Sequence, residues 1–486
     1  MQTTLKKTTD PLSVAADAIV VFVPQPAIAS GSAAAADLAL DGLVGACIAD
    51  GEITGETGQI SVIHTGGLVG APRLVVVGVG DGSVDAWRQA GRAAGARLGA
   101  IKARTVALSP DDADVARVTA LVAGVGYGAY RFDRYKTATP DPELAELRVY
   151  SVVVTPAQLR RASRLAGAVA AARDLANTPA NDLTPTALAA RAAELADQTT
   201  GLECEVLERK DLQKLGAGAL LSVAQGSAEP PKLIVLRYTP KRGAPSGEVL
   251  GLVGKAVTFD TGGISIKPAS GMEEMKLDMA GGAAVVEGVG LIAQLGVHVE
   301  VVAVVPATEN MPSGTATRPG DVVRALNGKT IEVINTDAEG RLILADALTY
   351  AATVAGATRL LDFATLTGAI VVALGEVYAG LFGSDEAWTE SVRAAGAASG
   401  DLCWPMPLHP GYAPLIKSKV ADLANAAAKR QAGAVYAAQF LREFTDGRPW
   451  CHVDIAGTGM VEGAGTGFGV GLMLAAAEQL AHAPRH

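Results

Sequence analysis

The sequence is poor in cysteine and in aromatic residues. Its 486 residues include four cysteines, and no two of them form a Cys-x-x-Cys pair. Their spacing therefore matches neither a zinc knuckle nor a dense disulfide framework. Because free thiols suit a reducing compartment, we expect a cytoplasmic protein. Aromatic residues make up 4% of the chain, so the core must be built mainly from Ala, Val, Leu and Ile.

Positive charge and long apolar runs are also scarce. The net charge is −9, whereas nucleic acids and anionic membranes are bound by basic surfaces. The best candidate for a membrane span, residues 368–383, contains Glu376 and is shorter than the ~20 residues that a span requires. Near the N-terminus, Asp10 and Asp17 interrupt any apolar core of a signal peptide. Composition therefore excludes membrane and collagen-like classes and disfavours secreted and DNA-coating ones.

The length and the hydrophobic pattern predict more than one α/β domain. Single cores usually split beyond about 250–300 residues. In the first third, β-branched runs alternate with Ala-rich stretches of helical spacing. They predict strands at 18–23, 73–79, 104–108 and 149–154 and helices at 84–98 and 114–125. We place a first domain at residues 1–155, a connecting helix and linker at 156–180, and a larger domain at 181–486.

The larger domain repeats the order strand, loop, helix. The pattern predicts helices at 280–294 and 342–352, and strands at 248–253, 298–305, 331–334 and 359–363. In open α/β sheets, ligands bind beyond the carboxyl ends of the strands. The loops after residues 253, 334 and 363 are therefore where we expect the chemistry.

Several nucleotide-binding motifs are incomplete. The run Gly78-Val79-Gly80 follows a predicted strand, but the third glycine of GxGxxG falls on Ser83. We interpret it as a glycine-rich turn. The run ending in Gly328-Lys329-Thr330 lacks the upstream glycine of a P-loop. The HExxH motif of zinc metalloproteases does not occur either.

Two loops of the larger domain are rich in carboxylates. The first spans residues 254–282, and the second reads NTDAEGRL at 335–342. If both lie at the same edge of the sheet, they bring together four carboxylates and three cations: Asp260, Asp278, Asp337, Glu339, Lys255, Lys267 and Arg341.

Three interpretations of these loops compete. Asn335, Asp337 and Glu339 match positions 1, 3 and 5 of a calcium loop, with Asp346 at position 12, but such a loop follows a helix rather than an apolar strand. A solvated acidic turn is a second interpretation, which the apolar flanks disfavour. Hard oxygen ligands on converging loops suit a two-metal hydrolase, and we favour this interpretation.

The second loop, together with VGKAVTFDTGGISIKP before it, resembles the signature of the leucyl aminopeptidases, the cytosol aminopeptidase family of dimetal exopeptidases. The resemblance runs from about residue 128 to the C-terminus, whereas residues 1–127 match only in general α/β character. Further segments resemble the family in order: GAYRFDRYK at 128–136, NTPANDLTP at 177–185, GSAEPP at 226–231, ATLTGA at 364–369, VADLAN at 420–425 and HVDIAG at 452–457.

The resemblance implies a fold and a function. The fold would be a macro-like N-terminal α/β domain plus a larger catalytic α/β domain with a central mixed sheet flanked by helices, assembled as a homo-hexamer. The enzyme would remove the N-terminal residue, leucine favoured, from peptides and amino-acid amides with a free amine. It would need two divalent metal ions per chain, Mn²⁺ or Zn²⁺.

The resemblance also implies ligands for these ions. Asp260 and Glu339 would bridge them, Asp337 would complete the more labile site, and Lys255 and Asp278 would complete the tighter one. A lysine ligand is unusual because its amine must lose a proton, but burial and metal binding both favour that loss.

The remaining implied roles concern the substrate. Lys267 would polarise the scissile carbonyl and stabilise the gem-diolate, and Arg341 would hold a bicarbonate ion that relays the proton of the attacking water. The pocket for the first side chain and the peptide backbone would be formed by Met275, Thr365, Leu366 and Gly368.

Two alternatives from other classes remain open. One is a nucleotide- or ADP-ribose-binding protein that uses the turn at residues 78–82. The other is an architectural DNA-binding role, as in some bacterial relatives of this family, and the net charge of −9 counts against it.

Overall fold

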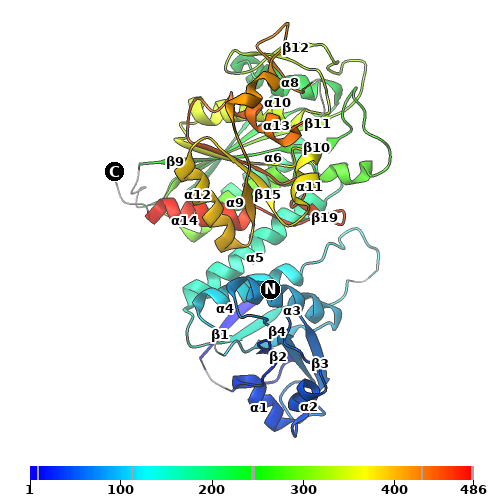
Figure 1. Ribbon diagram of the computed structural model, residues 1–486, viewed down its shortest axis with the longest axis vertical. Helices are drawn as coiled ribbons and strands as arrows, with labels where there is room; N and C mark the ends of the chain where they lie inside the picture. The colour runs from blue at the N-terminus through cyan, green and yellow to red at the C-terminus, as the bar shows by residue number, and fades with distance from the viewer. Residues whose placement is uncertain (8–9, 112, 139, 242–246, 428–430, 483–486) are drawn as a thin grey trace. The chain divides into compact units, whose positions relative to one another are not determined.

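The chain folds into two compact units. The computed structural model describes residues 1–7, 10–111, 113–138, 140–241, 247–427 and 431–482. The units are Met1–Ala170 and Ala171–His486, and both are drawn in Figure 1. The division falls within α5 (Pro156–Asn177), which lies in the segment 156–180 that the sequence predicts as a connecting helix and linker.

The first unit is a sheet covered by helices on both faces. Five strands run parallel and β3 is antiparallel to its neighbour. The order is β1 (Gln2–Lys6), β6 (Glu146–Tyr150), β5 (Thr105–Leu108), β2 (Ala18–Val23), β4 (Arg73–Gly78) and β3 (Ile60–His64). One face packs against α3 (Val84–Ala100) and α4 (Val115–Gly128), and the other against α1 (Gly31–Ala39) and α2 (Leu43–Ala49).

Strand β6 is the one element of this unit that the apolar pattern misplaces. The run of valines predicts a strand at 149–154, but β6 ends at Tyr150 and Val152 is 70% exposed. The strand instead begins at Glu146, where Leu147 and Val149 alternate with charged residues and pair with β5. A half-buried strand shows this alternation, so periodicity was the better guide than β-branching.

The second unit has a mixed sheet in which the central strands are parallel. The order is β16 (Cys403–Pro405), β15 (Ala379–Gly383), β18 (Trp450–Asp454), β14 (Arg359–Ala364), β9 (Val249–Gly254), β11 (Glu300–Asn310), β8 (Lys232–Tyr238) and β7 (Leu202–Leu207), with β10 (Ala256–Asp260) beside the end of β11. Strands β18, β14, β9, β11 and β10 run parallel.

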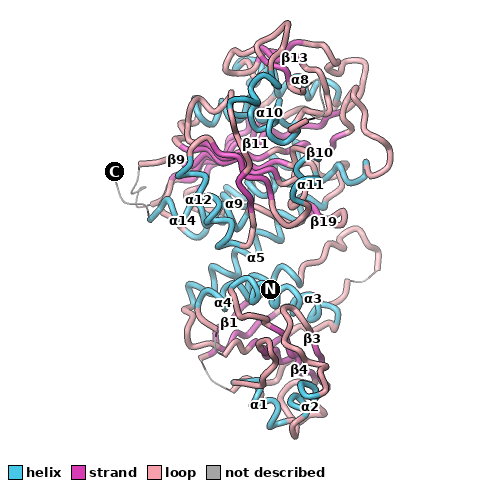
Figure 2. The backbone as a smooth tube through the Cα atoms, in the orientation of Figure 1, coloured by secondary structure: helices cyan, strands magenta, loops and turns pink. Residues whose placement is uncertain are grey.

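Helices cover both faces of this sheet as well (Figure 2). One layer contains α6 (Pro185–Asp197), α9 (Ala280–Leu295), α12 (Glu386–Ser399) and α14 (Val470–His482). The other contains α7 (Arg209–Leu215), α8 (Gly218–Val223), α10 (Gly340–Thr349), which continues into a π-helical turn at Tyr350–Val354, and α13 (Gly433–Arg442). A short helix, α11 (Gly368–Leu374), follows β14.

Two strands of this unit differ from the prediction in ways that shape the site. Strand β11 continues past Val305 to Asn310, because β10 pairs with its polar end and satisfies the backbone there. The strand predicted at 331–334 is β13 (Thr330–Glu332), and it lies in a separate three-stranded sheet with β12 (Val322–Arg324) and β17 (Leu423–Ala424). The second carboxylate loop is therefore supported by this small sheet and not by the main one.

The segment at 368–383 is not a membrane span. It consists of α11, a turn and β15. Among the described residues, the one single helical stretch of sufficient length and hydropathy is Met272–Leu295, and 94% of its apolar window is buried in the protein. The bent pair α1 and α2 would pass only if counted as one span. A buried core helix of a globular domain passes the same test.

Candidate active site

Lys255 lies in the single-residue gap between β9 and β10, at the carboxyl end of the central strands. Its Nζ is 2.7 Å from Asp278 Oδ2 and 2.7 Å from Glu339 Oε1, and it donates to the carbonyl oxygen of Thr365 at 3.0 Å. Asp278 ends the short 3₁₀ helix η2 (Met272–Leu277). One lysine thus joins the segments that follow β10, β13 and β14.

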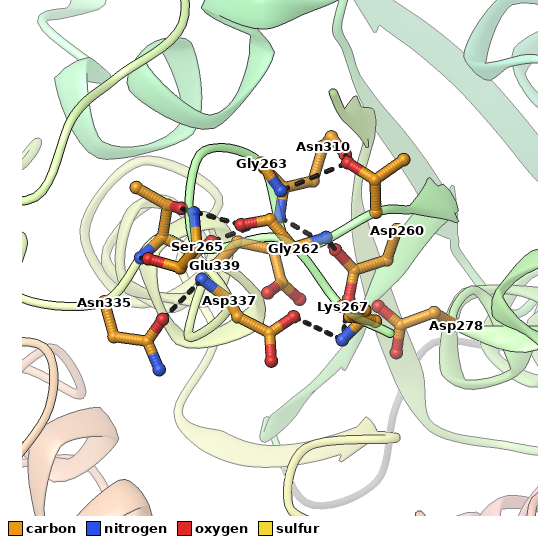
Figure 3. Close-up of polar contacts among 12 residues, drawn as sticks. Asp260, Gly262, Gly263, Ser265, Lys267, Asp278, Asn310, Asn335, Asp337 and Glu339 are labelled. Atoms are coloured by element: carbon orange, nitrogen blue, oxygen red, sulfur yellow. Dashed lines mark hydrogen bonds and ion pairs between the residues drawn. The ribbon is translucent and has the colours of Figure 1, made fainter. Parts of the chain in front are cut away.

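Asp260 is the last residue of β10, and its carboxylate is fixed by several donors. Asn310 Nδ2 and the backbone N–H of Gly262 donate to Oδ1 at 2.8 and 2.9 Å, and Lys267 Nζ lies 2.7 Å from Oδ2. Lys267 also bonds Asp337, as Figure 3 shows. Asn310 was missed in the sequence because the apolar run ends five residues earlier, and only the pairing of β10 with β11 places it here.

The turn at residues 335–340 presents Asp337 and Glu339. Asn335 Oδ1 accepts from the backbone N–H of Asp337 at 2.9 Å, an Asx turn that orients the loop. Asn425, fully buried, accepts from Ile334 N–H at 2.8 Å and donates to the Asn335 carbonyl at 2.7 Å. The loop is therefore held by a side chain about 90 residues away, and this gives the last residue of VADLAN a structural role.

Glu339 directly precedes α10, and Gly340 follows it because there is no space for a side chain. A Cβ at position 340 would lie 2.7 Å from Lys255 Nζ and 2.6 Å from its Cε. Glycine here lets the helix end approach the lysine, so that Glu339 reaches the same cluster.

The carboxylates fit a divalent cation. One oxygen each from Asp260, Asp337 and Glu339 lies within 4.8 Å of the others. Glu339 Oε2 is buried and has no hydrogen-bond partner among the described residues. A buried, unpartnered carboxylate oxygen is costly unless a cation binds it, and hard oxygen ligands suit Mg²⁺, Mn²⁺ or Zn²⁺.

Exposure changes across the cluster. The side chains of Lys255, Asp260, Asp278 and Glu339 are 3–8% exposed. Lys267 and Asp337 are 21% and 33% exposed. The cluster thus has one closed end, at Lys255 and Asp278, and one open end, at Lys267 and Asp337.

The charges of the cluster are strongly coupled. Burial raises the pKa of both Asp260 and Asp278, and the nearby negative charge of Glu339 raises it further. Burial alone would lower the pKa of Lys255, but Asp278 and Glu339 overcome this and raise it. Lys255 therefore keeps its proton while its ammonium is the cation at these oxygens, and it could act as a ligand only when a metal ion takes over that charge.

Arg341 is buried on the first turn of α10. Its Nη1 donates to the Asn425 carbonyl at 2.7 Å, and its guanidinium lies 5.1 Å from the ring centre of Tyr436. Its Nε is buried and has no partner among the described residues. The free N–H suits an anion such as the bicarbonate expected from the sequence.

The expected substrate-binding residues lie on two neighbouring segments. Thr365 Oγ1 donates to Asp278 Oδ1 at 2.7 Å, which brings the end of β14 into the cluster. Leu366 is half-buried and Gly368 is exposed at the start of α11. Met275 lies on η2, and its carbonyl accepts from Asp278 N–H at 3.4 Å.

The calcium-loop interpretation of residues 335–346 does not fit the structure. Asp346, which would be position 12, is buried within α10 and 1% exposed. Its two oxygens accept from the backbone N–H groups of Leu220 and Leu326 at 2.8 and 2.7 Å. Its role is therefore to fix the first turn of α8 and the turn after β12.

Asp346 should make stability depend on pH. Burial raises the pKa of its carboxyl from 3.8 to about 7. Between these two pH values the folded chain holds a proton that the unfolded chain has released. The contribution of Asp346 to the free energy of unfolding therefore falls as pH rises from about 4 to 7. The loss is about 1.4 kcal/mol per unit of pKa shift. Thermal unfolding at pH 5, 6, 7 and 8 should show wild type losing stability relative to Asp346→Asn as pH rises. A difference that stays constant with pH would contradict the assignment.

The turn at residues 78–82 is explained without a nucleotide. A Cβ at Gly78 would lie 2.0 Å from the carbonyl oxygen of Glu56, so glycine is required by the neighbouring loop. At the nearby start of α1, the backbone N–H of Ser32 donates to Asp111 Oδ2 at 2.5 Å. A carboxylate of the protein itself thus occupies the position where a helix N-terminus would bind phosphate.

Comparison with known proteins identifies relatives over most of the chain. The catalytic domain of the cytosol aminopeptidase family matches residues 170–474, and its N-terminal domain matches residues 20–139. A probable cytosol aminopeptidase of Solibacter usitatus (strain Ellin6076) is 49% identical over 424 residues, 85% of this chain and 87% of that protein. A protein of the same name from Alkaliphilus oremlandii (strain OhILAs) is 42% identical over 456 residues, 90% of each chain.

Solved structures agree with this result. A tomato leucine aminopeptidase mutant superposes with a TM-score of 0.90 at 31% identity, covering 99% of this chain and 96% of that one. The bottromycin maturation enzyme BotP in complex with Mn gives a TM-score of 0.83 at 34% identity, covering 96% and 100%. The two-domain α/β fold expected from the sequence is confirmed.

Proposed function

Since this chain belongs to the cytosol aminopeptidase family and is a metallo-exopeptidase, we propose that it removes the N-terminal residue, leucine favoured, from peptides and amino-acid amides. We place this activity in intracellular peptide turnover, in the cytoplasm, in agreement with the names of its relatives.

The observation that carries the proposal is the closed end of the charged cluster. A peptide would enter past Lys267 and Asp337, the more exposed pair, and its first residue would stop at Lys255 and Asp278, which are buried. A site that is closed one residue beyond the reacting bond would accept a chain end and exclude the middle of a chain. This geometry supports an exopeptidase.

We propose that the cluster holds two divalent ions, Mn²⁺ or Zn²⁺. Asp260 and Glu339 would bridge the two ions. Asp337 would bind the ion on the open side, and Lys255 and Asp278 would bind the ion on the closed side. The buried oxygen of Glu339 that has no partner among the described residues supports this arrangement. Bound there, such ions would supply Lewis-acid polarisation of the scissile carbonyl and activation of water.

The two cations that are not ligands would act on the substrate. Lys267 reaches both Asp260 and Asp337, so its ammonium is positioned at the open end, where the scissile carbonyl would lie, and can stabilise the charge that develops on its oxygen. Arg341 would hold bicarbonate through its free Nε–H, and this anion would accept the proton of the attacking water. Both groups are rigidly held, which favours catalysis.

The segments beside the cluster, η2 and residues 365–368, would select the substrate. Met275 and Leu366 are half-buried and apolar, which suits a leucine side chain. Thr365 and Gly368 would shape the pocket, and backbone groups of Leu366 and Gly368 would hold the peptide. Assembly as a homo-hexamer stays a prediction from the sequence, and no interaction with nucleic acid or membrane is proposed.

Acetylated and free substrates should separate this function from other hydrolases. Leucine p-nitroanilide should be cleaved, whereas N-acetyl-leucine p-nitroanilide should be cleaved at least about 100-fold more slowly. Acetylation removes the amine's basicity and adds bulk at the closed end, beside Asp278. Release of p-nitroaniline measures both rates.

A matched control changes the other end of the substrate. Amidating the C-terminus of a leucine-containing tripeptide should leave its rate within about 3-fold, because the proposed site recognises only the amine end. Comparable cleavage of acetylated and free leucine p-nitroanilide would refute the aminopeptidase proposal.

A further inference from the structure

Asp454, the last residue of β18, is a fully buried carboxylate outside the metal cluster. Its Oδ1 accepts from the backbone N–H groups of Leu366, Thr367 and Ala456 at 3.1, 3.4 and 3.3 Å. Its Oδ2 accepts from Thr367 Oγ1 at 2.7 Å. Both oxygens are thus used, and three of the four bonds go to the segment that follows β14.

The segment held by Asp454 joins the metal cluster to the proposed substrate pocket. Its first residue, Thr365, donates to Asp278 through Oγ1 and accepts from Lys255 Nζ through its carbonyl. Its next residues, Leu366 and Gly368, are those proposed to hold the peptide backbone. A shift of this segment would therefore disturb the closed end of the site and the substrate together.

Thr367 shows why a carboxylate stands at position 454. This threonine caps α11, and its Oγ1 accepts from Ile370 N–H at 3.2 Å. Its single hydroxyl proton is then directed to Asp454 Oδ2. Four donors meet at Asp454, and an acceptor-only group satisfies all of them.

The strand that carries Asp454 is a rigid support. Strand β18 is paired on both sides, and Asp454 lies opposite Ala364 of β14 and Gly380 of β15. The neighbouring Ile455 N–H donates to the Ala364 carbonyl at 2.8 Å. Residues 365–367, which follow β14, belong to no strand or helix. Their hydrogen bonds to Asp454 therefore attach this segment to the sheet.

We propose that Asp454 is a positioning residue for catalysis: it fixes the segment at residues 365–368 so that Thr365, Leu366 and Gly368 meet the metal cluster and the substrate in one geometry. The inference rests on the proposed function for its kinetic consequence, but the contact itself can be tested separately. Asp454 belongs to the segment HVDIAG at 452–457, so this segment would have a positioning role.

The test compares Asp454 with a matched buried aspartate. Asp346 also accepts backbone N–H bonds with both oxygens, but from Leu220 and Leu326. Asp454→Ala should lower kcat/KM for leucine p-nitroanilide by about 100-fold, since small displacements of a site have effects of this size. Asp346→Ala should lower the melting temperature but leave kcat/KM of the folded enzyme within about 3-fold.

The conservative variant provides a rescue. In Asp454→Asn the amide oxygen can still accept the three backbone N–H bonds, and the amide nitrogen can donate to Thr367 Oγ1. Its kcat/KM should lie within about 10-fold of wild type, far above that of Asp454→Ala. If Asp454→Ala does not fold, Thr367→Val serves instead, because it keeps the carboxylate and removes the hydroxyl that bonds Asp454 and caps α11; it should lower kcat/KM by about 10-fold.

Hydrogen exchange decides the inference independently of activity. Amides of Leu366 and Thr367 should exchange faster in Asp454→Ala than in wild type, and should be unchanged in Asp346→Ala. An inactive wild type would contradict the proposed function, and the exchange result would still stand. Unchanged exchange at these amides, or equal kinetic losses in Asp454→Ala and Asp346→Ala after correction for folded protein, would overturn the inference.

Discussion

Replacing Asp260 or Glu339 by alanine should abolish hydrolysis of leucine p-nitroanilide, with losses of at least roughly 1,000-fold in kcat. Each residue is proposed to bridge two ions, so its removal disturbs both. The structure adds a second reason for Asp260, because Asn310 and Lys267 both bond it and would lose a partner. Lys267 would then keep only Asp337 as a carboxylate partner among the described residues.

The control for these variants is a carboxylate outside the site. Glu390 forms an exposed ion pair with Arg393 on α12, and exposed pairs contribute little to stability. Glu390→Ala should therefore keep normal turnover. Circular dichroism and melting temperature verify that each variant is folded. Near-normal turnover in folded Asp260→Ala would refute its assignment as a bridging ligand.

Removing metal should have an equally large effect. Chelation should abolish activity, and Mn²⁺ or Zn²⁺ should restore it at two equivalents per chain. Asp260, Asp337 and Glu339 place their oxygens within 4.8 Å of one another, and like charges so close force protonation unless cations balance them. Burial and Glu339 already raise the pKa of Asp260, which indicates how strongly the cluster opposes its own ionisation.

Metal content and stability provide measurements besides turnover. Elemental analysis of active enzyme should give two divalent ions per chain. Chelation should lower the melting temperature, because ions that bind the folded chain stabilise it by mass action. The matched sample is enzyme treated with chelator already saturated with the same ion, Mn²⁺ or Zn²⁺. Fully active enzyme with one ion or none would contradict the two-metal proposal.

Comparison of sequence and structure shows which interactions can be predicted locally. Strand β2 begins and ends at the predicted residues, 18 and 23, because its six apolar residues are all buried. The helix predicted at 280–294 matches α9, in which every residue from Ala280 to Ala293 is buried. In these segments burial is nearly complete, so composition alone defines the element.

The supports of the site were not predictable in this way. Asn310, Asn425 and Asp454 bond partners 50, 90 and 88 residues away. Each looks like an ordinary polar residue at the end of a strand. Its partner becomes known only when strand order and register are known, since a register change by one residue turns every side chain to the other face.

The sequence by itself determined the family, the α/β class and the set of charged residues, because these depend on residue type and on spacing within single loops. Tertiary structure decided how those residues meet. It placed the second carboxylate loop on a small separate sheet, closed the cluster at Lys255 and Asp278, and left it open at Lys267 and Asp337. Burial and electrostatic coupling arise between segments distant in the chain, so they exist only once the sheet has brought those segments together.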